Sequence, residues 1–261
     1  MRIVVPVKQV AVVDEDFELV GDGAGVDPDF LEWSLNEWDD FSLEAALQLA
    51  EADEGAEVVV VTVGDEEATE GLLTCLAKGA DRGVRIWEEA LEGADALAVA
   101  RVLAAAVGRE SPDLVLCGVQ SSDAVNSATG VGLAAFLDLP HVAVVRAISA
   151  DGGMLTVERE LEGGLVEVLR IGLPALLTVQ TGINEPRYAN LRAIKQAREK
   201  PLEVLELGEL GLSQADVAAA SGARLRKLAV PEAGAGAEML EGSPAEVAAR
   251  IREIVQERLS T

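Results

Sequence analysis

A polar loop between two apolar segments holds the side chains best suited to bind a small anion. Residues 114–117 are apolar, Gly118 follows, residues 120–129 are rich in hydroxyl and amide groups, and residues 131–137 have the apolar content of a helix. We expect a strand, a loop and a helix in this order. In an open α/β sheet, such a junction directs the free backbone N–H groups of the helix toward the crevice beyond the strand. A phosphate group fits there.

The same loop has a plainer interpretation. Ser122, Asp123, Ser127 and Thr129 are of types that cap helices and fill turns, and the loop matches neither the P-loop pattern nor the dinucleotide fingerprint. Because it contains no lysine, backbone N–H and hydroxyl groups would have to hold the anion. This favours a monophosphate over a triphosphate with its metal. Nucleotide binding and simple capping both stay open at this point.

Side chains for other kinds of chemistry are scarce. His141 is the single histidine and stands at the start of an expected strand, which argues against a Ser-His-Asp triad and against a histidine-rich metal site. Cys75 and Cys117 lie in apolar contexts without a CxxC spacing. We therefore expect two buried free thiols in a cytoplasmic protein, no metal and no catalytic residue.

The charge of the chain limits its partners. With 21 basic and 46 acidic side chains the net charge is −25, so nucleic acid and anionic membrane surfaces would repel it. The first residues have the pattern of a strand and lack the basic and apolar regions of a signal peptide. The sequence contains no run of about 18 apolar residues, so we expect no membrane insertion.

The first 140 residues alternate between strand and helix patterns, which predicts a doubly wound parallel sheet with helices on both faces. An acidic excursion with a hairpin turn at residues 21–23 interrupts them, and Asp39 or Asp40 is the expected N-cap of the first helix. The expected strands cover residues 2–9, 57–63, 84–87 and 114–117, and the expected helices begin near residues 43, 66, 94 and 131.

After His141 the pattern changes to successive strands, expected at residues 143–148, 154–160, 165–171 and 175–180. Glycine pairs at 152–153 and 163–164 suit hairpin turns, so we expect an antiparallel hairpin extension of the sheet. Residues 201–243 are too poor in apolar side chains for a core of their own. We therefore expect two parts, residues 1–200 and a C-terminal arm of residues 201–261, with a linker at 231–242 and an amphipathic helix at 244–259. The arm either packs on a partner chain or is a loosely attached extension.

Six segments then carry a resemblance to a known family. They include residues 36–46, which begin Asn-Glu-Trp-Asp-Asp, Gly-Val-Gln-Ser-Ser-Asp at 118–123 and Asn-Glu-Pro-Arg-Tyr-Ala-Asn-Leu at 184–191. The others lie at residues 77–82, 157–160 with the glycines 163–164, and 173–175. In wording and order they resemble the beta subunit of electron transfer flavoprotein. The wording is most similar to the methylotroph branch, whose electron donor is trimethylamine dehydrogenase.

The resemblance implies a Rossmann-like fold and a heterodimer with an alpha subunit that binds most of a redox-active FAD. It also implies an electron carrier and no enzyme activity of its own. The beta subunit would bind AMP structurally, and electrons would pass from a flavin dehydrogenase, acting on acyl-CoA, trimethylamine or a similar substrate, to a quinone oxidoreductase of the respiratory chain.

Carried onto this chain, the resemblance implies an AMP pocket at the mouth of the sheet. Pro6 lacks the N–H that a smaller residue would offer there, and Ala124 and Val125 replace aspartates of some relatives, which affects the ribose contacts. The implied pocket residues are Pro6, Asn36, Glu37, Trp38, Asp39, Val63, Gln120, Ser121, Ser122, Asp123, Asn126, Ser127, Ala128, Thr129, Gly130 and Val131.

The resemblance implies two further sites. Trp38 and Glu160 would face the flavin, and residues 188–200 would dock the dehydrogenase through Leu191, with Arg187, Tyr188 and Ile194 beside it. A basic cluster of Arg192, Lys195 and Arg198 surrounds this anchor. The alternative is a helix that packs its apolar face on its own sheet and does not need Leu191 exposed.

Two other functions compete with the AMP-binding carrier. One is an electron-bifurcating electron transfer flavoprotein, with a second FAD in place of AMP. The other is a stand-alone ATP-binding signalling module, which would need neither the hairpin extension nor the arm.

Overall fold

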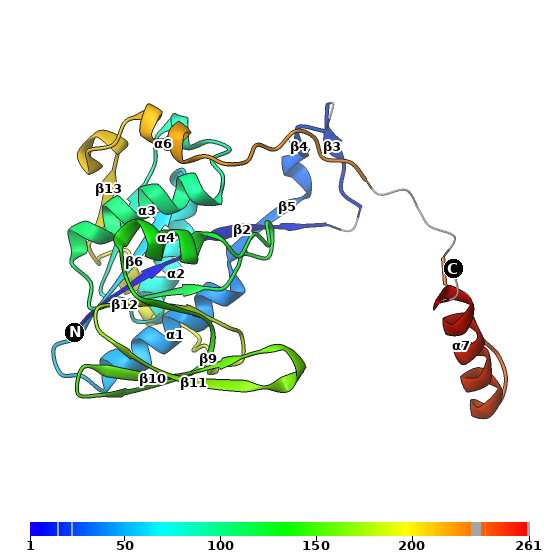
Figure 1. Ribbon diagram of the computed structural model, residues 1–261. Coiled ribbons are helices and arrows are strands. Elements are labelled where there is room, and N and C mark those ends of the chain that lie inside the picture. The colour runs from blue at the N-terminus through cyan, green and yellow to red at the C-terminus, as the bar shows by residue number, and fades with distance from the viewer. Residues whose placement is uncertain (15, 22, 231–235, 238, 260–261) are drawn as a thin grey trace. The chain divides into compact units, whose positions relative to one another are not determined.

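The computed structural model describes residues 1–14, 16–21, 23–230, 236–237 and 239–259. Within these ranges nine strands form one sheet in the order β11-β10-β9-β12-β8-β1-β6-β7-β13 (Figure 1). The strands are β1 (Arg2–Pro6), β6 (Glu57–Val63), β7 (Arg82–Ile86), β8 (Leu114–Gly118), β9 (His141–Asp151), β10 (Met154–Glu160), β11 (Val166–Gly172), β12 (Ala175–Val179) and β13 (Leu202–Leu205).

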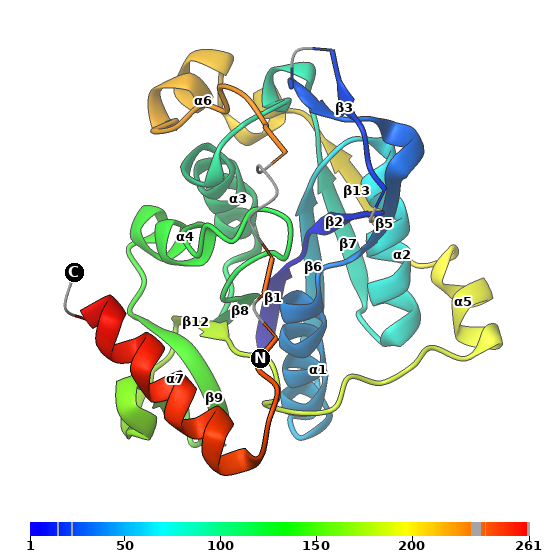
Figure 2. The same cartoon turned by 90° about the vertical axis from the view of Figure 1, so that its right-hand side faces the viewer.

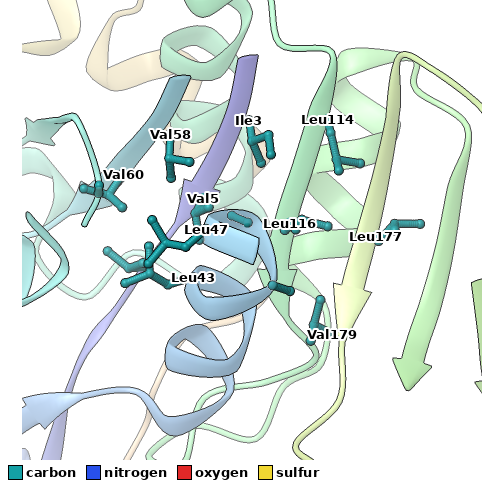
Figure 3. Packing of buried hydrophobic residues seen from close by; sticks show 14 of the residues in the cluster. Ile3, Val5, Leu43, Leu47, Val58, Val60, Leu114, Leu116, Leu177 and Val179 are labelled. Carbon is teal, nitrogen blue, oxygen red and sulfur yellow. The ribbon is translucent and has the colours of Figure 1, made fainter. Parts of the chain in front are cut away.

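The centre of the sheet is parallel because its strands are apolar on both faces. In β1, the side chains of Ile3 and Val5 belong to one core cluster and that of Val4 to the other, as the two-residue period of a strand requires. Figure 3 shows Leu47 of the first helix next to Val5, with Ile3 further along the same strand. The predicted doubly wound sheet is confirmed.

Helices cover both faces of this sheet (Figure 2). The first cluster packs under α1 (Glu37–Glu51), α2 (Thr69–Lys78) and α5 (Leu191–Ala197), and the second under α3 (Ala96–Glu110), α4 (Thr129–Leu137) and α6 (Gln214–Ala220). Short 3-10 helices occupy Pro28–Phe30, Glu66–Ala68, Glu89–Leu91, Glu162–Gly164 and Leu207–Leu210.

The predicted N-cap of the first helix is wrong. The cap is Asn36, and Asp39 and Asp40 lie in the first turn of α1. Acidic residues favour a helix N-terminus in either position, because they complement its partial positive charge. Asp39 is therefore free to accept hydrogen bonds from outside the helix.

The acidic excursion forms two small antiparallel ribbons. The predicted hairpin is confirmed as β3 (Leu19–Val20) paired with β4 (Gly25–Val26), while Asp22 of its turn lies outside the described residues. The expected first strand is shorter than predicted. The chain leaves the sheet after Pro6 and continues as β2 (Gln9–Val13), which pairs with β5 (Leu31–Leu35).

The hairpin extension is confirmed as β9, β10 and β11, which pair antiparallel in sequence order. Gly152 and Gly153 close its first turn with φ values of 55° and 83°, a region that glycine enters without steric cost. The extension joins the parallel sheet where β9 pairs with β12.

The division expected at residue 200 differs from the structure. Strand β13 pairs with β7, and Leu205, Leu207 and Val217 are buried against the existing core. Low apolar content therefore does not exclude residues 201–220 from the sheet unit, because a few leucines suffice to cover an edge that is already formed.

The chain instead forms one compact unit of Met1–Lys227 and a second of Leu228–Thr261. The second contains α7 (Pro244–Leu259), at the predicted bounds. Residues 231–235 and 238 of the predicted linker lie outside the described residues. In the part of the chain that is described, no helix has the length and apolar content needed to cross a bilayer.

Candidate functional site

A cavity of about 220 Å³ lies beyond the carboxyl ends of β1, β6 and β8. This edge is where open α/β sheets bind ligands. Most of the sequence-predicted nucleotide residues line it, namely Pro6, Asn36, Asp39, Val63, Gln120, Ser121, Asn126, Ser127, Ala128, Thr129 and Gly130. The lining does not include the other five, Glu37, Trp38, Ser122, Asp123 and Val131.

The start of α4 forms one wall of the cavity. Ala128 precedes the helix and makes no side-chain cap, and the first helical hydrogen bond runs from the N–H of Gly132 to the carbonyl of Ala128. The backbone N–H groups before Gly132 are those that a helix leaves without a partner inside itself. The plainer interpretation is therefore wrong for this helix end, since none of the four suggested side chains caps it. An anion-binding end stays available.

Two glycines allow α4 and α1 to lie close to the strands at this cavity. A Cβ at Gly130 would lie 2.7 Å from Cys117 Sγ and 2.7 Å from Thr178 Cγ2, and one at Gly118 would lie 2.6 Å from Trp38 Cβ. Contacts this short do not occur between real side chains, so any larger residue at either position would displace α4 or α1.

Asn36 and Asp39, at the start of α1, fix the opposite wall. Asn36 Nδ2 donates to the carbonyl of Gln120 at 2.9 Å, and Asn36 Oδ1 accepts from the N–H of Ser122 at 3.2 Å. The buried carboxyl of Asp39 accepts from the N–H groups of Lys8 at 2.8 Å and Gly118 at 3.1 Å. These two side chains join β1, β8 and the polar loop.

The carboxyl of Asp39 is electrostatically unusual. Burial raises the pKa of Asp39 to about 7, although the hydrogen bonds with Asn36, Lys8 and Gly118 act in the opposite direction. Two backbone N–H donors suit the ionised form, and a low dielectric opposes it. A negative charge on a ligand nearby would favour the protonated form further.

Lys8 is a pocket residue that the sequence-based site did not include. Its Nζ lies 2.7 Å from both carboxylate oxygens of Asp123 and 3.4 Å from Ser121 Oγ, so a cation stands beside a loop that has no lysine of its own. The position of Lys8 at the exit of the first strand was the available signal.

In the polar loop, Val125 and Ser127 have φ values of 50° and 49°, a conformation uncommon for such residues.

Asp95 is the second residue that the sequence reasoning missed. It lines the cavity, its Oδ1 caps α3 by accepting from Leu97 and Ala98, and its Oδ2 accepts from the N–H groups of Gly222 and Ala223 at 2.7 and 2.6 Å. An aspartate directly before a helix that follows a strand predicts such a cap. Its contact with residues 222–223 has no sequence signal.

The docking segment, residues 188–200, lies on the face of the sheet that α1 and α2 cover. Tyr188 is 97% exposed, Leu191 81% and Ile194 48%, while Ala197 at the end of α5 is buried against the core. The expected exposure of Leu191 is thus observed. Arg187 is bonded within this chain, because its guanidinium pairs with Glu44 and Glu51 of α1.

Comparison with known proteins identifies the family of the chain. The model of the electron transfer flavoprotein domain matches residues 28–210. The chain is 50% identical, over 261 residues and 98% of each chain, to the electron transfer flavoprotein subunit beta of Methylophilus methylotrophus. The chain belongs to the electron transfer flavoprotein beta subunit family.

More distant members of this family agree. The chain is 38% identical to the human electron transfer flavoprotein subunit beta over 81% of this chain and 84% of the relative. It is 34% identical to the Bacillus subtilis subunit beta over 93% of each. The resemblance stated from the sequence, including its methylotroph branch, is confirmed.

The two residues expected to face a flavin lie on different elements of this beta subunit fold. Trp38 is half-buried in the first turn of α1, and its Nε1 donates to Gln180 Oε1 at 2.9 Å. Glu160 is exposed at the end of β10.

Within the described residues no group of three or more His, Cys, Asp or Glu side chains converges as a metal site would require.

Proposed function

We propose that this chain is the beta subunit of a two-chain electron transfer flavoprotein that carries electrons from a flavin dehydrogenase to a quinone oxidoreductase. In this assembly it binds AMP, contributes side chains to an FAD held mainly by the alpha subunit, and docks the dehydrogenase. Its buried, unpaired Cys75 and Cys117 support a cytoplasmic location. The observation that carries the proposal is the pocket formed by the uncapped start of α4 at the mouth of the sheet.

The pocket suits a mononucleotide. The pocket has a volume of about 220 Å³ and offers one helix N-terminus for a phosphate group. We propose AMP as its ligand, and a count of flavins per heterodimer separates this electron carrier from the bifurcating variant. The N–H groups at the start of α4 would hold the phosphate, and the side chains of Gln120, Asn126 and Ser127 would hold the rest of the nucleotide.

FAD, when bound, supplies one- and two-electron transfer, and the protein supplies binding and orientation. We assign Trp38 and Glu160 to the flavin-facing surface of this chain. The hydrogen bond from Trp38 to Gln180 fixes the indole ring, so a flavin would meet a flat apolar surface in a defined orientation.

We expect the Trp38→Ala heterodimer to bind FAD less tightly and to show a shifted flavin absorption spectrum. Fluorescence titration of the flavin-free heterodimer with FAD and a visible spectrum of the loaded protein provide the two readouts. A spectrum and an affinity equal to those of the parent would remove Trp38 from the flavin site.

The unit of residues 228–261 supports association with an alpha subunit. Helix α7 has 16 residues, and its apolar side chains Ile251, Val255 and Leu259 are exposed. A helix of this length is only marginally stable alone in water. We infer that this apolar face packs on the alpha subunit.

Co-expression with an alpha subunit tests the proposal. The expected product is a yellow complex with one copy of each chain in size-exclusion chromatography, whose flavin is reduced by a trimethylamine or acyl-CoA dehydrogenase supplied with its substrate. A chain that is stable and monodisperse by itself, and does not associate with the alpha subunit, would favour the stand-alone ATP-binding module.

A further inference from the structure

Three charged side chains outside the pocket join the docking segment to helix α1. Arg187 Nε donates to Glu44 Oε2 at 2.8 Å, Nη2 donates to Glu44 Oε1 at 3.0 Å, and Nη1 donates to Glu51 Oε1 at 2.6 Å. The backbone N–H of Arg187 also donates to Glu44 Oε2, at 3.2 Å. We call Arg187, Glu44 and Glu51 the Arg187 clamp.

The clamp is strongest at Glu44. The side chain of Glu44 is 6% exposed, and that of Glu51 is 62% exposed. A two-point contact between a guanidinium and a carboxylate fixes direction as well as distance, and it is stronger when water is excluded. A buried Glu44 cannot reach a partner protein, so its charge acts inside this chain.

The docking segment is held at both ends. Before Tyr188, Asn184 Nδ2 donates to the carbonyl of Phe41 at 3.0 Å, and Arg187 binds Glu44 and Glu51. After Leu191, Lys200 Nζ donates to the carbonyls of Leu76 and Ala80 of the α2 region at 3.0 and 2.5 Å. The most exposed apolar side chains of the segment lie between these attachments, on a backbone tied to α1 and α2.

We propose that Arg187 and Glu44 are positioning residues for dehydrogenase docking, which hold the turn that presents Tyr188 and Leu191 and make no contact with the partner. This rests on the docking role in the proposed function. An exposed apolar anchor binds well when its backbone is already ordered, because association then does not have to order it. Loss of the clamp should therefore weaken docking although every docking side chain is still present.

The test is the rate of flavin reduction by trimethylamine dehydrogenase, measured against the concentration of the complete heterodimer. For Glu44→Gln we expect KM to rise roughly three- to tenfold while kcat changes by less than about twofold, because the lost order affects binding and leaves the bound complex unchanged. Glu51→Gln, at an exposed position where folding is not at risk, should raise KM in the same direction by less.

The matched control is Glu110→Gln. Glu110 binds both terminal nitrogens of Arg82, its side chain is 13% exposed, and the pair joins the start of β7 to the end of α3, a helix on the face of the sheet opposite α1 and α5. This variant loses a comparable ion pair, so a general loss of stability would appear in it equally. We expect its KM to equal that of the parent.

A double-mutant cycle with Leu191→Ala decides between positioning and an unrelated effect. If the clamp acts by presenting Leu191, the Glu44→Gln change should raise KM by less in the Leu191→Ala background than in the parent. Additive effects, or a parental KM for both Glu44→Gln and Glu51→Gln, would overturn the inference while leaving docking intact. A parental KM for Leu191→Ala, or a parent heterodimer that the dehydrogenase does not reduce, would instead contradict the proposed docking function and with it the inference.

Discussion

At the scale of single residues, two glycines leave space at the pocket and one leucine extends into solvent. Gly130 and Gly118 leave room for α4 and α1 to approach the strands at the pocket. Leu191 is 81% exposed, more than any other leucine that the structure describes in residues 1–227. Each has a substitution that tests it.

Leu191→Ala should slow electron transfer from the dehydrogenase and leave the FAD content unchanged. The expected loss in the efficiency kcat/KM is roughly tenfold, as when an exposed apolar anchor no longer fills a partner pocket. Stopped-flow reduction of the heterodimer measures it. Val204→Ala, which shortens another half-exposed aliphatic side chain on β13, is the control and should behave like the parent; equal rates for both variants would exclude Leu191 from docking.

Gly130→Ala should lower both nucleotide content and stability. Its methyl group would meet Cys117 and Thr178 at 2.7 Å, and overpacking of this kind costs about 1–3 kcal/mol. The free energy of unfolding and the AMP content of the purified heterodimer are the measurements. At Gly208 an added Cβ meets nothing within 4 Å, so Gly208→Ala should retain the parental nucleotide content. A Gly130→Ala protein with full nucleotide content would show that α4 does not need its close approach.

At the scale of elements, the sequence predicted the strands better than their surroundings. Strands 57–63 and 154–160 are apolar or alternating without a breaker, so their bounds are recovered. The early end of β1 was not predicted, although Pro6 is a signal for it, because a proline lacks the N–H that a central strand needs. That β2 then pairs with β5 has no local signal. Local pattern specifies that a strand forms, and pairing between distant segments decides where it ends.

The candidate site, too, could be predicted only in part from the sequence. The polar loop and Asn36 could be predicted because strand ends meet at one edge of a parallel sheet. Asp95 and Lys8 could not be assigned from the loop pattern, because neither belongs to the loop. Asp95 reaches the cavity from the connection between β7 and α3, and Lys8 reaches it from the residues that follow β1. The resemblance supplied Leu191, and only the structure showed that Arg187 binds its own chain.

The link between α1 and the docking segment makes stability depend on pH. Burial of Glu44 raises its pKa, but the hydrogen bonds from Arg187 and Gln48 outweigh this, so the pKa of Glu44 lies below its ordinary 4.5. A lowered pKa in the folded state stabilises the protein above about pH 4.5, and this contribution is lost as the pH falls through the lowered value.

The parent should therefore exceed Glu44→Gln in unfolding free energy by about 1–2 kcal/mol at pH 7. The difference should shrink steadily below pH 4.5, because a protonated glutamate resembles glutamine. Urea unfolding of both proteins at several pH values measures it, with Val204→Ala as a variant that does not titrate. A difference that stays constant or grows toward low pH would contradict the assignment of the ion pair.

At the scale of the whole molecule, the charge and the exposed apolar side chains of the chain favour association with another protein. Its charge of −25 keeps it apart from other acidic surfaces, while α7 and the docking segment expose apolar side chains. The sheet unit contains the pocket, and the second unit contains little core of its own. Both observations favour a function that requires a second chain.

Ile251→Asp should weaken assembly with the alpha subunit, because it places a charge on the apolar face of α7. We expect the dissociation constant of the heterodimer to rise at least tenfold, measured by analytical ultracentrifugation. Arg252→Gln changes a neighbouring polar side chain and should assemble normally. Undisturbed assembly of the Ile251→Asp protein would remove α7 from the interface.

The most direct test of the account is the nucleotide content of the purified heterodimer, released by denaturation and quantified by chromatography. The pocket at the start of α4 predicts one AMP and one FAD per heterodimer. Two FAD, or no adenylate apart from FAD, would contradict it.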